Sequence, residues 1–271
     1  MVRPGETISG RTLQTFPGGK GANQSNAIAK AGGSVWHAGK VGADGRWMLD
    51  VLGEAGVHTD LVRVYDGPSG HAVIQVDTRG ENSIVLFGGG NHTITTEEID
   101  GFLGGFSAGD YLVLQNEITN VPYAMDAAAE RGMRICLNPA PFDEDIRSWP
   151  LESVEILILN HTEAAGLIGA DGSADELLSK LTARYPNTEV VLTAGAAGAL
   201  FGRGDDRGAR PAHPVDAVDT TAAGDTFLGY YLVARGRGAT PGEAVERATR
   251  AAALAVSRPG AMSSIPWAHE I

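Results

Sequence analysis

The sequence predicts an α/β protein with a doubly wound, mainly parallel sheet of the Rossmann-like, three-layer kind and a small antiparallel β lid. Four short apolar runs bounded by polar or turn residues are typical of parallel strands buried on both faces; they span residues 111–114, 135–137, 156–159 and 190–192. Helix-like stretches separate these runs, and such alternation indicates βαβ units. With 271 residues and no low-complexity linker, the chain is expected to form a single domain, residues 1–271.

The remaining elements follow from local patterns. Helices are expected between the strands and in the alanine-rich C-terminal third, over residues 122–131, 174–184, 223–234 and 242–257. One segment breaks the alternation of strands and helices. Residues 71–75 and 82–87 flank Asp77-Thr78-Arg79-Gly80 and predict an antiparallel hairpin outside the main sheet.

Composition narrows the class of function. The formal net charge of -12 argues against binding to nucleic acid or to an anionic membrane surface. The single cysteine, Cys136, excludes an internal disulfide and a cysteine-based zinc site, and its apolar context favours a buried strand residue over a reactive thiol. Without a signal-peptide pattern or an apolar run of about 18 residues, the expected location is the cytoplasm.

Residues 218–227 hold the largest group of candidate functional residues, since small residues precede an amphipathic helix there. Ala222, Ala223 and Gly224 leave room for a phosphate to approach the free N–H groups of the first helical turn. Asp225 lies in that turn, where a carboxylate is electrostatically favoured. A base beside an anion hole is what phosphoryl transfer to an alcohol requires, although a plain N-capped helix has the same local pattern.

Two more segments follow strands, at the edge where ligands of open α/β sheets bind. Thr193-Ala194-Gly195-Ala196-Ala197-Gly198 is glycine-rich but matches neither a Walker loop nor the dinucleotide fingerprint. Asn160 opens a helix after the strand at 156–159, and together with Glu163 it fits a capping box as well as a ligand site.

A third group of residues suits a hydroxyl-rich ligand. Pro17-Gly18-Gly19-Lys20-Gly21-Ala22-Asn23-Gln24 places glycines, a lysine and amides before a helix. The glycines permit close approach, while Lys20 and Asn23 offer donors to hydroxyl groups. Glu117, just after the strand at 111–114, is a candidate hydroxyl acceptor or a merely solvated loop residue.

Together these segments resemble the ribokinase family of carbohydrate kinases, also called the PfkB family, over essentially the whole chain. The matching stretches occur in family order: Pro4-Gly5-Glu6-Thr7, 18–24, 80–84, Leu137-Asn138-Pro139-Ala140-Pro141, 160–163, 219–227, Arg258-Pro259-Gly260-Ala261 and Ser264-Ile265-Pro266. The resemblance implies a ribokinase-like fold and ATP-dependent phosphorylation of a sugar, with O5 of D-ribose as the expected acceptor.

The resemblance also implies roles for individual residues. Asp225 would deprotonate the sugar hydroxyl, and Ala222, Ala223 and Gly224 would form the anion hole. The sugar would contact Gly18, Gly19, Lys20, Asn23, Glu117 and Asp225. ATP would contact Asn160, Thr193, Gly195, Gly198, Gly224, Asp225 and Thr249, although relatives often carry Asn or His at the position of Thr249.

Cations and a partner subunit are implied in the same way. Glu163 would help to hold Mg2+ through water, and oxygen ligands would hold K+; the expected K+ residues are Asp219, Thr221, Ala255, Arg258, Gly260 and Ser264. The lid, formed by about residues 5–16 and 70–90, would cover the sugar and exclude water. Pairing of two lids would make the protein a homodimer.

The sequence departs from the family pattern at its start. Relatives carry a first buried strand and an Asn-x-Asp segment that grips sugar hydroxyls, and residues 1–16 contain no substitute strand. We expect the neighbouring strand to expose its edge, and sugar binding to be weakened. Two alternatives therefore stay open: a kinase for another sugar or nucleoside, and a truncated sugar- or nucleotide-binding protein with little turnover.

Overall fold

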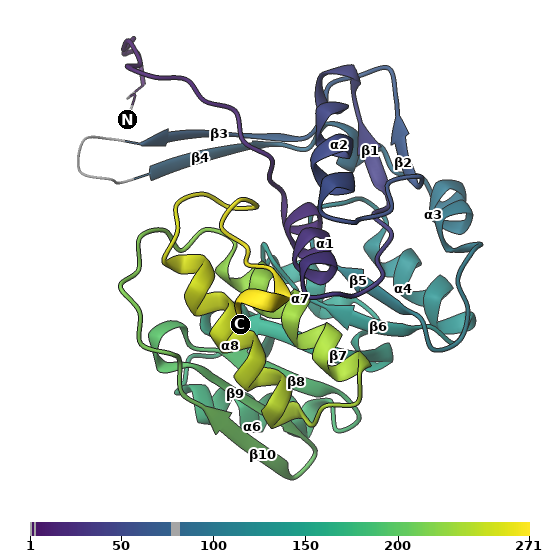
Figure 1. The fold of residues 1–271 in the computed structure, drawn as a ribbon. Coiled ribbons are helices and arrows are strands. Elements are labelled where there is room, and N and C mark those ends of the chain that lie inside the picture. Colours follow the sequence, from purple (N-terminus) through teal and green to yellow (C-terminus); the bar gives the residue numbers. More distant parts are fainter. Residues whose placement is uncertain (1, 3, 77–81) are drawn as a thin grey trace.

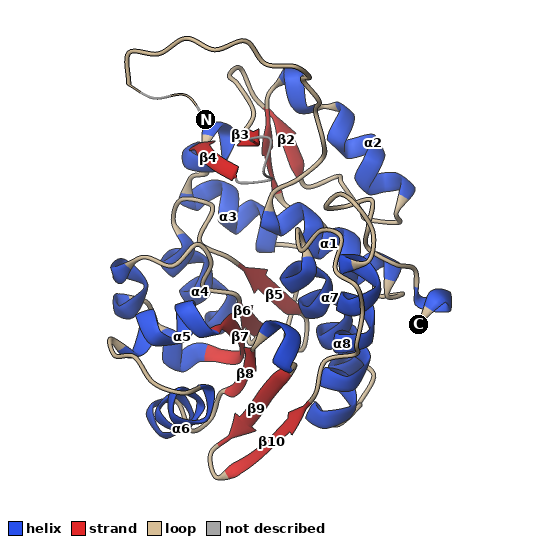
Figure 2. Ribbon diagram, turned by 90° about the vertical axis from the view of Figure 1, so that its left-hand side faces the viewer, coloured by secondary structure: helices blue, strands red, loops and turns tan. Residues whose placement is uncertain are grey.

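The computed structural model describes residues 2, 4–76 and 82–271, and its main body has three layers (Figures 1 and 2). The central layer is a six-stranded sheet in the order β10-β9-β8-β7-β6-β5. Strands β5 to β8 are parallel and β9 and β10 are antiparallel; their bounds are β5 Tyr111–Leu114, β6 Arg134–Leu137, β7 Val154–Asn160, β8 Glu189–Thr193, β9 Ala199–Arg203 and β10 Asp206–Arg210. The predicted α/β class and its four parallel strands are confirmed, while the antiparallel edge was not predicted.

Helices cover both faces of this sheet. One face carries α1 Lys20–Lys30, α7 Ala223–Gly236 and α8 Pro241–Val256, and the other carries α3 Thr96–Leu103, α4 Val121–Glu130, α5 His161–Ile168 and α6 Ala174–Arg184. Successive strand residues point to opposite faces, so Ile135 and Leu137 join one core and Cys136 joins the other. Burial raises the pKa of the Cys136 thiol, which agrees with an inert core residue. None of the described helices is long and apolar enough to cross a membrane.

A second, two-stranded sheet lies beside the first and was not predicted from sequence. It pairs β1 Gly39–Val41 with β2 Val62–Val64 in parallel, next to α2 Trp47–Glu54. Three-residue strands are too short to give a period-2 signal. In the part of the chain that the structure describes, β5 pairs only with β6, so its other edge has no strand partner. A cavity of about 2540 Å³ is lined by residues of β5 and by residues 35–41.

The predicted hairpin is confirmed as β3 His71–Val76 paired with β4 Asn82–Phe87 (Figure 1). The turn predicted at Asp77-Thr78-Arg79-Gly80 lies outside the described residues. Residues 5–16 form neither helix nor strand, but Val2 N–H donates to Gln75 Oε1 on β3 over 3.1 Å.

Candidate active site

Asp225 lies in the first turn of α7. Ala222 before it adopts the left-handed conformation, with φ 60, and this turns the chain into the helix. A Cβ built on Gly224 would meet no atom within 4 Å, so the space beside the first turn is open. The first N–H groups of a helix have no partner within it and can face an anion; here Ala223 N–H also donates to the Thr220 carbonyl over 3.2 Å.

Two side-chain amides on α1 hold the carboxylate of Asp225. Asn23 Nδ2 donates to Oδ2 and Gln24 Nε2 donates to Oδ1, each over 2.9 Å. All three side chains are buried. Because each amide takes a different oxygen, the plane of the carboxylate is fixed while further lone pairs stay available to accept a proton.

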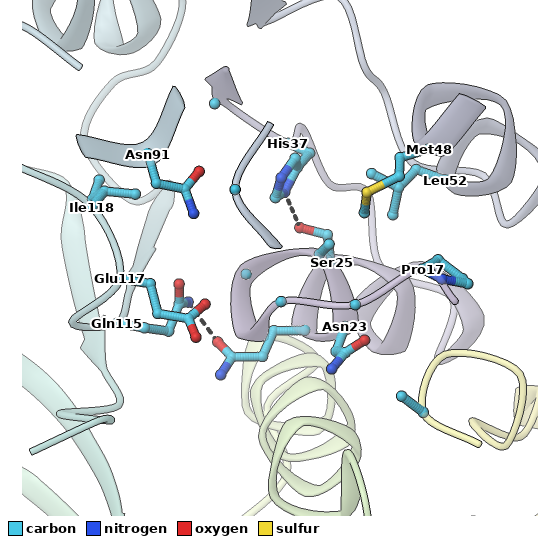
Figure 3. Close-up of a pocket in the computed structure, with 18 of the residues that line it drawn as sticks. Pro17, Asn23, Ser25, His37, Met48, Leu52, Asn91, Gln115, Glu117 and Ile118 are labelled. Carbon is cyan, nitrogen blue, oxygen red and sulfur yellow. Dashed lines mark hydrogen bonds between the residues drawn. The ribbon is translucent and has the colours of Figure 1, made fainter. Parts of the chain in front are cut away.

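Further polar groups come from the start of α1 and from the segment after β5. Glu117 Oε2 accepts a hydrogen bond from Lys20 N–H over 2.9 Å. Gly19 has φ 92, a left-handed conformation that suits glycine at this sharp entry into the helix. Among the described residues, Asn23 Oδ1 is buried without a hydrogen-bond partner. Figure 3 shows Glu117 and Gln115 on one wall of the cavity and Asn23 on another, an arrangement that suits a ligand with several hydroxyl groups.

Burial dominates the electrostatics of the site. It raises the pKa of Asp225, against the opposing effects of the Lys20 charge and the two amide hydrogen bonds. Burial also raises the pKa of Glu117, where the Lys20 N–H and charge oppose the shift and the charge of Asp225 adds to it. A base with a raised pKa accepts a proton more readily, so the environment favours proton transfer to Asp225.

The capping box predicted for Asn160 and Glu163 is present at the junction of β7 and α5. Asn160 Oδ1 accepts from Glu163 N–H, and Glu163 Oε2 accepts from Asn160 N–H, each over 2.9 Å. Asn160 Nδ2 also donates to Glu163 Oε1 over 2.8 Å. Both glutamate oxygens therefore serve the helix terminus, and each keeps lone pairs that can accept from a water molecule. Burial raises the pKa of Glu163.

The predicted nucleotide loop lies beside this junction, because Thr193 at the end of β8 pairs with Asn160 at the end of β7. Gly195 has φ 55, and a Cβ there would meet no atom within 4 Å, which leaves room for a ligand. The fold itself requires glycine at position 198, because its φ is 101 and a Cβ there would lie 2.1 Å from the Arg210 carbonyl oxygen. Thr249 is buried in α8, where its hydroxyl donates to the Glu246 carbonyl over 2.9 Å.

The segments predicted to hold K+ also meet. Asp219 Oδ1 accepts from Thr221 N–H and Oδ2 accepts from Gly260 N–H, each over 2.9 Å. Burial alone would raise the pKa of Asp219, but these hydrogen bonds lower it overall. At the end of α8, Arg258 N–H donates to the Ala255 carbonyl over 3.1 Å. Ser264 is buried, with its hydroxyl donating to the Ala261 carbonyl over 2.8 Å.

Three residues of the site were not assigned a role from sequence. Gln24 contacts the carboxylate of Asp225, and both Gln115 and Asn138 contact Gln24. Gln115 follows β5 and Asn138 follows β6, so an amide directly after each of two neighbouring strands was the available signal. A sequence pattern alone does not show that the two amides meet on one side chain of α1.

Comparisons with known proteins agree with this geometry. The family model described as pfkB family carbohydrate kinase matches residues 2–268. A ribokinase of Haemophilus influenzae is 33% identical over 278 residues, which cover 100% of this chain and 90% of the relative. The crystal structure of a Cryptococcus neoformans ribokinase in complex with ADP is similar, with a TM-score of 0.87 and 33% identity, covering 100% of this chain and 92% of that one. The structure of Arabidopsis thaliana ribokinase complexed with ribose and ATP has a TM-score of 0.84 and 30% identity, covering 98% of this chain and 89% of that one.

Proposed function

The chain belongs to the pfkB family of carbohydrate kinases, and on this premise we propose that it transfers the γ-phosphoryl group of ATP to O5 of D-ribose. The observation that carries the proposal is the buried carboxylate of Asp225 at the open first turn of α7, clamped by two amides of α1. The similarity to ribokinases over nearly the whole chain supports ribose as the acceptor.

In the proposed reaction, Asp225 accepts the proton of the sugar hydroxyl as its oxygen attacks the γ-phosphorus. The N–H groups of residues 222–224 stabilise the negative charge that develops on the transferred group. Glu117 and Asn23 Oδ1 accept hydrogen bonds from other sugar hydroxyls, and Gly18, Gly19 and Lys20 complete the sugar site. Asn160, Thr193, Gly195, Gly198 and Thr249 line the nucleotide site in this proposal.

The donor sets fit the two cations that the family implies. Glu163 keeps lone pairs for waters of a Mg2+ ion, and Asp219, Thr221, Ala255, Arg258, Gly260 and Ser264 offer oxygen atoms to K+. Mg2+ supplies charge neutralisation on the phosphates when it is bound. Asp219 itself holds the Thr221 and Gly260 backbones in place through hydrogen bonds.

We further propose that the lid pairs with the lid of a second copy. Both faces of the β3–β4 hairpin are apolar: Val73 pairs with Val85 on one face, and Ile74 pairs with Ile84 on the other. These four side chains are 52% to 64% exposed. A two-stranded hairpin is marginally stable by itself, so one face can cover the sugar while the other is covered by a partner. The proposed location is the cytoplasm, where free buried thiols such as Cys136 persist.

The test is ADP formation by this chain with and without D-ribose, in Mg2+ with either K+ or Na+. We expect ribose-dependent turnover that K+ enhances, and a loss of at least about 1000-fold in Asp225→Asn because the general base is removed. A folded sample without turnover on ribose would contradict the proposal. Turnover on another sugar or nucleoside in the same assay would reassign the acceptor, and nucleotide binding without any turnover would favour a binding protein.

A further inference from the structure

Gln24 contacts the base of the proposed reaction but has no place yet in the mechanism. Its side chain is 1% exposed, and all of its hydrogen-bonding groups face partners within the protein. Gln24 Nε2 donates to Asp225 Oδ1 over 2.9 Å and to Asn138 Oδ1 over 3.3 Å. Gln24 Oε1 accepts from Gln115 Nε2 over 2.6 Å, and Figure 3 shows Gln115 at the cavity wall.

The orientation of the Gln24 amide is determined by a chain of contacts that begins at the main chain of β7. Asn138 Nδ2 donates to the Ile158 carbonyl over 3.0 Å, and a carbonyl can only accept. Asn138 must therefore present its oxygen to Gln24, and Gln24 must present its NH2 group in return. The second hydrogen of that NH2 group points at Asp225.

Reversing the amide would be costly. Gln24 Oε1 would then face two acceptors, Asp225 Oδ1 and Asn138 Oδ1. Buried polar atoms without partners are destabilising, and a buried carboxylate without its donor is more so. The contacts with β6 and β7 thus fix which end of the amide meets the base.

We propose that Gln24 is a positioning residue for Asp225, that Asn138 sets the polarity of its amide, and that Gln115 supports it through a hydrogen bond to Oε1. Resting on the proposed kinase function, this assigns a role to Asn138 of the Leu137-Asn138-Pro139-Ala140-Pro141 segment. The donated hydrogen stabilises the ionised carboxylate and fixes the rotation of its plane, so that a free lone pair stays aimed at the acceptor hydroxyl.

The first test compares wild type with Gln24→Met, which keeps the length of the side chain and removes the donor. We expect kcat to fall about tenfold or more and the acid limb of the kcat/KM profile to move to higher pH by about one unit, because a hydrogen bond to a charged group is lost. The KM for the sugar should change less than kcat. Asn187→Met, at an Asn on an exposed turn before β8, is the control for a general effect of replacing an amide by a thioether.

A double-mutant cycle separates positioning from a structural role. In the Asp225→Asn background, Gln24→Met should cost little further activity, because its effect passes through the carboxylate. An undiminished additional loss in that background, or a loss of activity with no shift of the pH profile, would overturn the proposal. Because Gln24→Met can reduce folding yield, Gln115→Met supplies a milder variant at a half-buried residue, with a smaller shift expected in the same direction.

A readout without substrate keeps this inference distinct from the proposed function. The 13C NMR titration of the Asp225 carboxyl, assigned by its absence in Asp225→Asn, reports the pKa of the base in the ligand-free chain. That pKa should rise in Gln24→Met by about one unit. If wild type does not phosphorylate ribose but this pKa shift is observed, the proposed function is wrong and the positioning role of Gln24 is supported. If ribose is phosphorylated and the pKa does not change, only the positioning role is wrong.

Discussion

At the scale of single residues, the site is defined by a buried carboxyl group, Asp225, and a half-buried one, Glu117, whose charges are only partly compensated. Asp225 receives two amide hydrogen bonds and Glu117 receives one backbone N–H, yet burial still raises the pKa of both groups. A ligand with several hydroxyl groups supplies the donors that these oxygens lack. The same feature that prepares the site for a sugar therefore lowers the stability of the ligand-free protein.

Glu117→Gln tests this trade-off. Gln can still accept the Lys20 N–H, while the half-buried charge is removed, so we expect a gain in unfolding free energy of up to about 1 kcal/mol at pH 7. Because the folded pKa of Glu117 is raised, the wild-type chain loses stability as pH rises through that pKa. The gain should therefore fade as pH falls below it.

Urea unfolding of both proteins at pH 4 and pH 7 measures this difference, and sugar titration should show a higher KM in the variant. A variant that is less stable than wild type at pH 7 would argue that Glu117 carries no net charge penalty in the fold.

At the scale of elements, four α-helices of the described chain begin with the same capping device, but only one of them opens at the candidate site. Reciprocal boxes cap α3, α5, α6 and α8. The α5 box uses Asn160 and Glu163, and the α6 box uses Ser173 and Glu176. Comparison of the two boxes separates the helix-capping role of Glu163 from its proposed role beside Mg2+.

Glu163→Gln and Glu176→Gln make a matched pair. Each should cost about 1 kcal/mol or less, because Gln also fits a capping box. Only Glu163→Gln should raise the Mg2+ concentration that gives half-maximal turnover, by about tenfold, since it removes a charge that orders the waters of the cation. Mg2+ titrations of turnover, read beside thermal unfolding, decide the point. Equal Mg2+ dependence in both variants would leave Glu163 as a helix cap only.

At the scale of the whole molecule, the main sheet, the small β1–β2 sheet and the hairpin meet around one large cavity. The wall formed by α1 and the segment after β5 carries the candidate sugar residues, and the hairpin contributes apolar side chains to the same space. Burying this apolar surface would stabilise the protein, and the proposed lid pairing accounts for the part that belongs to the hairpin.

Lid pairing predicts a dimer that charged residues on the hairpin disrupt. Ile84→Lys with Leu86→Lys alters one face, and Val73→Lys with Val85→Lys alters the other. At least one pair should give a monomer by light scattering at micromolar concentration, because a buried lysine without a partner is costly. Val64→Lys, on an exposed position of β2, is the control. A wild-type monomer, or a dimer that survives both pairs of substitutions, would contradict the lid interface.

The sequence alone determined the parallel strands, the helices between them and the segments that carry the candidate chemistry. These follow from short-range patterns: the continuous apolar run of 156–159 for β7, the Asn160–Glu163 spacing for the α5 cap, and the small residues before Asp225 for the start of α7. Such patterns depend only on neighbouring residues, and therefore they can be read along the chain.

Only the tertiary structure decided which of these residues meet. The clamp on Asp225 joins α1, α7 and the ends of β5 and β6, and its contacts span from 91 to 202 positions in sequence. The separate β1–β2 sheet likewise depends on where distant segments pack. Local spacing does not predict such contacts, because the packing of the whole chain determines which polar groups meet inside the core. In a folded protein few buried polar atoms remain without a partner.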